Sequence, residues 1–237
     1  SHSRSTEAHL FHSIKSSARL QVTVPAEVRQ KLDAALDEFF PKSTEMVLQG
    51  RIFYRVRIHD FGQDDPLEAK DMVAPPPDKA SWGRVQIAGN PVLYTASEIE
   101  TAIAEVRPAV DSILTIAEFS PKTGEEIRIF NLTQRERPEA TKNPNEYTAR
   151  ILSLSKAMRF SEREFSRQVH PNDPDKYLDT VYIAQVIREK GFDGIAYKSL
   201  LNKDGVNYAF FSPDRLACKT PTTRRKVTTV KIESESL

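Results

Sequence analysis

The fold of this chain is organised around one segment, GRVQIAGNPVLYTASEIETAIAEVR, which runs from Gly83 to Arg107. Its second half predicts a helix. Ser97 and Glu100 have the spacing of a capping box, in which the hydroxyl accepts an N–H of the first turn and the carboxylate accepts the N–H of the cap. Pro108 is expected to end the helix. Four apolar residues recur with helical period and predict an inward face: Ile99, Ala102, Ile103 and Val106.

Three polar residues of this segment are candidates for function. Arg84 lies on the glycine-flanked loop, Tyr94 at the end of a short predicted strand, and Glu105 in the helix. At about 100° per residue, Glu105 falls at the border of the apolar face, beside Ala102. A carboxylate at the edge of a core is partly desolvated and is therefore either paired or functional, although many glutamates at such borders are simply solvated.

The composition is that of an ordinary globular protein. The chain has 237 residues, 39% of them hydrophobic and 28% charged, which is enough for one large domain with or without an appendage. A net charge of +1 provides no overall attraction to nucleic acid or to an anionic membrane. The single cysteine, Cys218, excludes an intramolecular disulfide and fits a reducing, cytoplasmic location. We expect neither a membrane span nor a signal peptide.

Upstream of the central segment, the pattern predicts a helix and a strand. Residues 25–40 form an amphipathic helix that either packs on the main domain or binds a partner. Residues 51–58, RIFYRVRI, alternate as a strand does, with Arg55 and Arg57 on one face, so that this face is exposed or lines an anion-binding cleft. Residues 60–81 are a long loop rich in Asp and Pro, of a kind that often binds ligands.

Downstream, strands predominate and helices are interleaved. The turn at Pro121–Gly124 predicts a hairpin between strands at 112–119 and 126–132. Two helices are expected, at 146–169 and at 176–190, and Gly191 closes the second. Two strands are expected at 194–199 and 206–211, around a turn at 202–205, and a last strand at 216–219. This order favours an α+β domain with a mixed or antiparallel sheet.

Several common catalytic motifs are missing from the sequence. It contains no Walker loop, no GxGxxG, no HExxH and no nucleophile elbow. The five histidines, His2, His9, His12, His59 and His170, do not have the spacing of metal ligands, so we predict no metal site. The short basic run Arg224–Lys226 is expected to be a solvated end.

Taken together, the remaining candidates resemble the RES-domain family, which is named for its Arg, Glu and Ser positions. The resemblance runs from about Ile52 to Pro213, and Gln86 stands where the family often has Asn. The matching pieces are Phe53–Arg55, Asp65–Leu67, Gly83–Arg84, Gly89, Tyr94–Ser97, Thr101–Glu105 and Gly191–Ser199, followed by Asn207 and Phe210.

The resemblance implies an NAD-degrading enzyme whose split, mixed or antiparallel sheet with flanking helices is similar to that of ADP-ribosyltransferases. In the best-known members, the domain is the toxin of a bacterial toxin–antitoxin pair and cleaves NAD⁺ at the nicotinamide–ribose bond. The acceptor is phosphate in some members and water in others. Carried over by position, the site consists of Arg55, Arg84, Tyr94, Glu105 and Ser199, with Tyr54 beside it.

The residue types suit this reaction. Cleavage passes through an oxocarbenium-like transition state, which the carboxylate of Glu105 would stabilise while it holds the ribose. The guanidinium groups of Arg84 and Arg55 match the geometry of a pyrophosphate or of an incoming phosphate. Tyr94 would stack on the nicotinamide, with Tyr54 beside it, and Ser199 would hydrogen-bond the carboxamide or the ribose.

Two alternatives remain at this point: a transferase that moves ADP-ribose onto a macromolecule, and a nucleotide-sensing or interaction module without turnover. The expected partner is NAD as substrate. Phosphate as a co-substrate, a cognate antitoxin and a second copy of the chain are left open. We expect binding neither to a membrane nor to nucleic acid. We expect residues 1–45 to form an N-terminal extension, 46–219 the RES-like NAD-binding catalytic domain, and 220–237 a polar tail.

Overall fold

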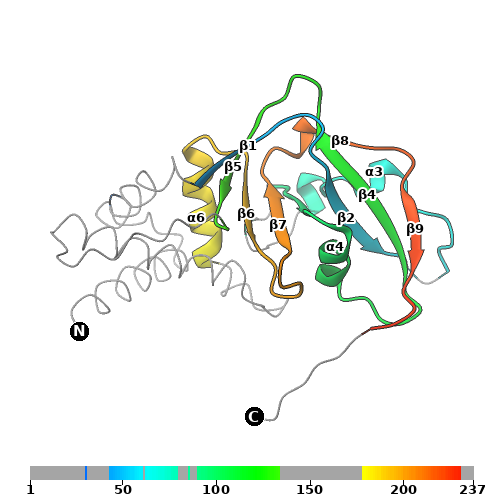
Figure 1. Ribbon diagram of the computed structural model, residues 1–237. Coiled ribbons are helices and arrows are strands. Elements are labelled where there is room, and N and C mark those ends of the chain that lie inside the picture. The colour runs from blue at the N-terminus through cyan, green and yellow to red at the C-terminus, as the bar shows by residue number, and fades with distance from the viewer. Residues whose placement is uncertain are drawn as a thin grey trace, which may run out of the picture.

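The computed structural model describes residues 43–60, 62–79, 90–133 and 178–230, together with residues 30 and 85, and the side chains of 178–183 are not included. The fold is α+β, as predicted. The described strands form one nine-stranded sheet in the order β1-β5-β6-β7-β3-β2-β4-β8, with β9 also paired to β4 (Figure 1). β5 and β6 run parallel, and every other pair of neighbours in this sheet is antiparallel.

The strands are β1 (Thr44–Val47), β2 (Phe53–Ile58), β3 (Leu93–Ala96), β4 (Ile113–Pro121), β5 (Ile127–Asn131), β6 (Gly194–Lys198), β7 (Val206–Phe210), β8 (Leu216–Cys218) and β9 (Thr223–Lys226). The α-helices are α3 (Ala69–Met72), α4 (Ile99–Val106) and α6 (Leu178–Glu189), and the short 3₁₀ turns are η1 (Pro77–Lys79) and η3 (Pro213–Arg215).

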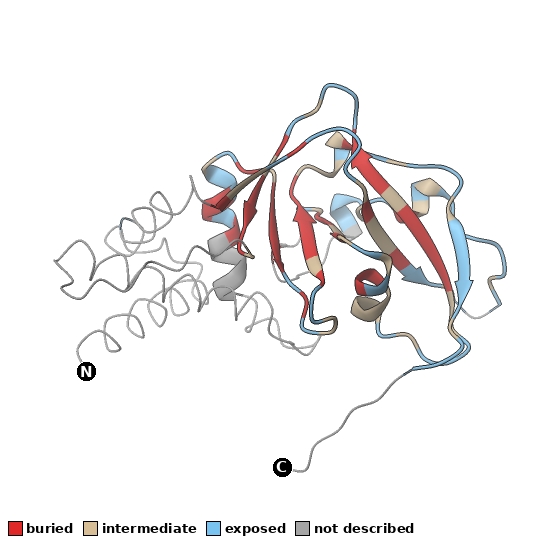
Figure 2. Cartoon of the chain, in the orientation of Figure 1, coloured by how far each residue is buried: buried red, intermediate tan, exposed pale blue. Residues whose placement is uncertain are grey.

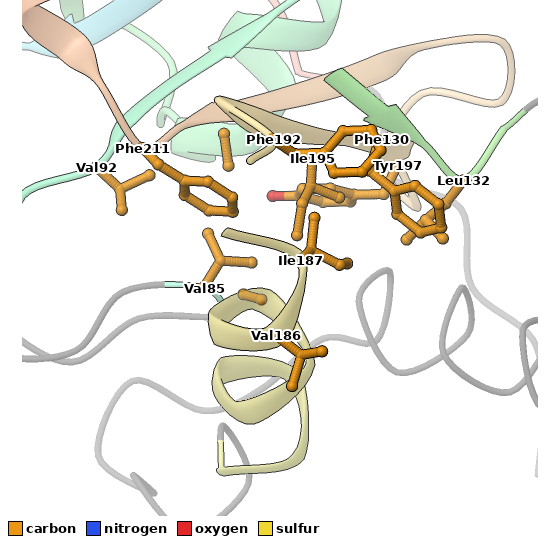
Figure 3. Close-up of a cluster of buried hydrophobic side chains, with 12 residues drawn as sticks. Val85, Val92, Phe130, Leu132, Val186, Ile187, Phe192, Ile195, Tyr197 and Phe211 are labelled. Atoms are coloured by element: carbon orange, nitrogen blue, oxygen red, sulfur yellow. The ribbon is translucent and has the colours of Figure 1, made fainter. Parts of the chain in front are cut away.

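Helices α4 and α6 pack on the same face of the sheet, which we call the helix face. The register pairs Tyr54 with Ala96, Ala96 with Asn207, and Asn207 with Tyr197, so these four side chains all point to the helix face. Over β5, β6 and β7, α6 buries one apolar cluster, which includes Phe130, Ile187, Ile195, Tyr197 and Phe211 (Figure 3). Over β2 and β4, α4 completes a smaller cluster with Val56, Leu114 and Ile116.

The opposite face holds the two halves of the sheet together. β2 and β3 are joined at a single register position, Tyr54 with Ala96. Phe53 of β2 nevertheless contacts two rings of β7 across β3, with centroid distances of 4.7 Å to Tyr208 and 4.9 Å to Phe210. Burial of these aromatic rings therefore replaces the missing backbone pairing between β2 and β3.

The helix expected at 176–190 is confirmed as α6, and its C-terminus is closed as the sequence predicts. Gly191 has a φ of 79°, and its N–H donates to the carbonyl of Arg188 at 3.0 Å, while Phe192 N–H donates to Ile187 at 3.4 Å. This is a Schellman motif, which needs a left-handed residue directly after the helix. The chain then enters β6 with Gly194 at its first position.

Two expectations are wrong. Strands β4 and β5 do not form a hairpin, because β4 pairs with β2, β8 and β9 whereas β5 pairs with β1 and β6. The segment from Thr220 is not only a polar tail: Thr223–Lys226 forms β9, whose residues are all exposed and line the edge of the sheet (Figure 2). β1 begins at Thr44, just inside the extension expected at 1–45. The helix expected at 146–169 lies outside the described residues, and so does the helix expected at 25–40 apart from residue 30.

Gly194 is required by close packing. A Cβ at this position would lie 2.5 Å from the carbonyl oxygen of Ala209 and 2.9 Å from Cδ1 of Ile129. We predict that Gly194→Ala lowers the free energy of unfolding by about 2–3 kcal/mol, because the β6 backbone would have to move between two neighbours. The denaturant midpoint should fall without a change of slope.

Gly124→Ala is the control for this substitution. Its Cβ would meet open space, but its φ of 80° strains any other residue by about 1 kcal/mol. Equal losses in the two variants would contradict a role for crowding at Gly194.

Candidate functional site

The start of α4 is tied to β7 rather than capped by its own side chain. The N-cap is Glu98, without a side-chain hydrogen bond, so the expected capping box at Ser97 and Glu100 is wrong. Ser97 Oγ instead accepts the N–H of Val206 at 3.3 Å, and Ser97 N–H donates to the Val206 carbonyl at 2.9 Å. The hydroxyl is therefore engaged by the neighbouring strand.

Glu105 lies in the last turn of α4, half-buried at the border of its apolar face as predicted. Its Oε1 accepts two hydrogen bonds, from Ser199 Oγ at 2.7 Å and from Asn207 Nδ2 at 2.7 Å. Ser199 directly follows β6, and Asn207 belongs to β7, so the carboxylate is held by two elements remote in sequence. Hydrogen bonds to an ionised acceptor are about twice as strong as neutral ones, and this pair fixes where the carboxylate points.

Ser199 is 5% exposed and has two roles in the fold. Its Oγ accepts the backbone N–H groups of Leu201 at 3.1 Å and of Asn202 at 3.2 Å, which shapes the turn between β6 and β7. The same hydroxyl donates to Glu105. Ser199 therefore shapes the turn and holds Glu105, whereas its expected hydrogen bond to the carboxamide or the ribose stays a prediction.

Tyr94 is half-buried in β3 and packs against the cluster under α6. Its hydroxyl accepts the N–H of Val85 at 3.4 Å, and Val85 is itself buried. Tyr94 therefore anchors the backbone immediately after Arg84. Arg84 itself lies outside the described residues, and its place in the site stays a prediction.

Arg55 lies where β2 and β3 separate. Its Nη1 donates to the carbonyl of Tyr94 at 3.4 Å, and its buried Nε has no hydrogen-bond partner among the described residues. Burial, with a smaller contribution from neighbouring Arg57, lowers the pKa of Arg55 to about 10. Strand alternation directs Arg55 to the face opposite the one that carries Tyr54 and Glu105, so the structure joins Glu105 to Ser199 but shows no contact of either with Arg55.

Three residues at this site were not assigned a role from the sequence. Asn207 holds Glu105, and Asn202 Nδ2 donates to Thr101 Oγ1 at 2.8 Å, one turn before Glu105 on α4. Asn207 is 4% exposed and Thr101 is fully buried. Two features of the sequence could have indicated these roles: Asn207 is a polar residue inside the apolar strand VNYAF, and Thr101 precedes Glu105 by four residues.

The described residues contain neither a membrane-spanning helix nor a cluster of metal ligands. No helix there is long and apolar enough to cross a membrane. No group of three or more His, Cys, Asp or Glu side chains in the same residues could hold a metal ion.

The fold and site define an α+β protein in which a helical glutamate is held by a β-hairpin. Residues 52–230 match the family model described as the RES domain. The chain therefore belongs to the RES-domain family.

The chain is also similar to a solved structure. The structure is that of the M. tuberculosis MbcT–MbcA toxin–antitoxin complex, with 11% sequence identity and a TM-score of 0.42. The match covers 83% of this chain and 94% of that one. No curated protein matches this chain.

The contact between Asn207 and Glu105 predicts a pH-dependent variant. Asn207→Asp would place a second carboxylate beside the first, and two adjacent carboxylates do not ionise independently, so one pKa rises in the folded state. A raised carboxyl pKa lowers stability as pH increases through it. We expect the variant to approach wild-type stability near pH 4 and to lose about 1–3 kcal/mol relative to wild type by pH 7.

Urea denaturation at each pH would measure this difference. Asn207→Ala is the matched control, because it loses the hydrogen bond without adding a charge, so its deficit should change less between the two pH values than that of Asn207→Asp. A pH-independent deficit in Asn207→Asp would contradict the close approach of the two groups.

Proposed function

We propose that this protein cleaves NAD⁺ at the nicotinamide–ribose bond and passes the ADP-ribosyl group to phosphate or water. The observation that carries the proposal is the Glu105 carboxylate, with one oxygen held by Ser199 and Asn207. Membership of the RES-domain family supports it. By the same resemblance, we propose that the protein acts in the cytoplasm as a toxin with a cognate antitoxin.

The chemistry needs one well-placed carboxylate. Departure of nicotinamide leaves positive charge on the ribose, and an anion fixed beside that sugar stabilises the transition state. The nicotinamide ring is cationic in NAD⁺ and leaves as a neutral molecule, so a general acid is not required. The second oxygen of Glu105 receives no hydrogen bond from the part of the chain that the structure describes, and we assign it to the ribose.

The remaining residues would bind the rest of the nucleotide. Arg55 is a half-buried cation whose Nε has no hydrogen-bond partner among the described residues, and it would gain a partner from a phosphate group. Tyr94 accepts the N–H of Val85, the residue that follows Arg84 in the sequence. We propose that both arginines bind the diphosphate or an acceptor phosphate and that Tyr94, with Tyr54 beside it, contacts the nicotinamide.

Glu105→Gln should abolish the reaction. The amide oxygen of Gln can still accept from Ser199 and Asn207, so the variant should fold, but it lacks the negative charge. We expect the rate of nicotinamide release to fall by about 100-fold or more. Glu100→Gln is the control, since Glu100 is exposed on the same helix and should leave the rate unchanged. If the wild-type protein neither binds NAD⁺ nor releases nicotinamide, with or without phosphate, the proposal is wrong.

The acceptor can be identified from the products. Phosphorolysis predicts a rate that rises with phosphate concentration and a product that carries an additional phosphate, visible by phosphorus NMR. Hydrolysis predicts ADP-ribose and no dependence on phosphate. Labelled NAD⁺ incubated with cell lysate tests the alternative of transfer: label in a macromolecule would support an ADP-ribosyltransferase instead.

A further inference from the structure

The hydrogen bonds of Ser199 leave its hydroxyl without free capacity. A serine hydroxyl has one proton and two lone pairs. Both lone pairs face backbone donors, Leu201 N–H at 3.1 Å and Asn202 N–H at 3.2 Å, and the proton faces Glu105 Oε1 at 2.7 Å. An ionised carboxylate only accepts, so Ser199 must be the donor. A ligand could be bound by Ser199 only at the expense of one of these contacts.

The turn between β6 and β7, which begins at Ser199, is also fixed to α4. Asn202 Nδ2 donates to Thr101 Oγ1 at 2.8 Å, and Gly205 packs directly on the same threonine. A Cβ on Gly205 would lie 2.2 Å from Thr101 Oγ1, so only glycine permits this approach. The turn is closed by Ser199 N–H to the Gly205 carbonyl at 2.9 Å. Thr101 is fully buried and therefore does not itself meet solvent.

From this geometry we propose that Thr101 and Asn202 are positioning residues for Glu105 and act through Ser199, which does not bind substrate. The proposal rests on the proposed NAD⁺ cleavage at Glu105. Asn202 links the turn to α4 one helical turn before the glutamate, so the carboxylate and its serine donor are held at a fixed separation. Loss of this link lets the turn move and misplaces the charge that must face the ribose. Binding of the nucleotide elsewhere is unaffected.

Thr101→Val tests this directly, because valine keeps the shape of threonine and removes the acceptor oxygen. We expect kcat for nicotinamide release to fall by about 10-fold, as small misplacements of catalytic groups do, with KM within about two-fold of wild type. Thr101→Ser restores the oxygen and should recover most of kcat. Equal losses in the Val and Ser variants, or an unchanged kcat in Thr101→Val, would overturn the proposal.

A double-mutant cycle separates this role from general stability. Asn202→Ala removes the side-chain amide but keeps the backbone N–H that donates to Ser199. If Asn202 acts through Thr101, the double variant should be no slower than either single one, whereas multiplied losses would contradict the link. Melting temperatures identify a merely structural effect, which would lower stability without changing kcat of the folded protein.

A readout without NAD⁺ keeps the inference distinct from the proposed function. The side-chain amide of Asn207 donates to Glu105, so its NMR resonance, assigned by its loss in Asn207→Ala, reports on the carboxylate. We expect this resonance to shift in Thr101→Val and to return towards wild type in Thr101→Ser. If wild type releases no nicotinamide but the resonance behaves in this way, the proposed function fails and the positioning network stands. An unmoved resonance in Thr101→Val overturns the network.

Discussion

The structure around Glu105 depends on a polar seam between α4 and the β6–β7 hairpin. Thr101 and Glu105 are four residues apart and lie on one side of α4, and Ser97 directly precedes the N-cap of this helix. Each is hydrogen-bonded to the hairpin: Ser97 with Val206, Thr101 with Asn202, and Glu105 with Ser199 and Asn207. The adjacent stripe of the helix is apolar and packs on the sheet. α4 is thus held by apolar burial on one side and by directional contacts on the other.

These two kinds of contact constrain the helix in different ways. Apolar burial stabilises the helix but is not directional, and a helix that rotated slightly would bury similar area. The polar seam allows one position, since a shift by one turn would leave the fully buried Thr101 and the carboxylate of Glu105 without their partners. An unsatisfied buried polar group costs about 1–3 kcal/mol, more if it is charged. The seam therefore determines the orientation of α4 and, with it, the direction of the carboxylate.

The sequence predicted local structure better than pairing. Helical periodicity located α4, and Gly191 marked the end of α6, because both signals are contained in a few adjacent residues. The predicted hairpin of β4 and β5 is wrong because strand pairing depends on distant segments. The turn at Lys122–Glu125 does form, with a hydrogen bond of 3.0 Å, but β4 and β5 each pair with other strands. The capping box failed because Val206, more than a hundred residues away, engages the hydroxyl of Ser97.

The candidate site shows the same division. The border position of Glu105 followed from helical geometry alone. The family resemblance assigned Glu105 and Ser199 to one site, and the structure shows a hydrogen bond between them. Asn202 and Thr101 could not be paired from the sequence, because their contact depends on how closely Gly205 lets the hairpin approach the helix. The alternation of side chains along the strand predicted that Arg55 and Tyr54 point to opposite faces of the sheet. The family resemblance assigned both residues to one site and did not show this difference.

The placement of Arg55 follows from the opening in the sheet. β2 and β3 pair at Tyr54 and Ala96, and beside that pair the guanidinium of Arg55 donates to the carbonyl of Tyr94. With a pKa of about 10, Arg55 remains protonated at neutral pH even though burial disfavours its charge. A bound anion would offset that penalty, which gives a physical reason for a half-buried arginine whose Nε has no hydrogen-bond partner in the described part of the chain.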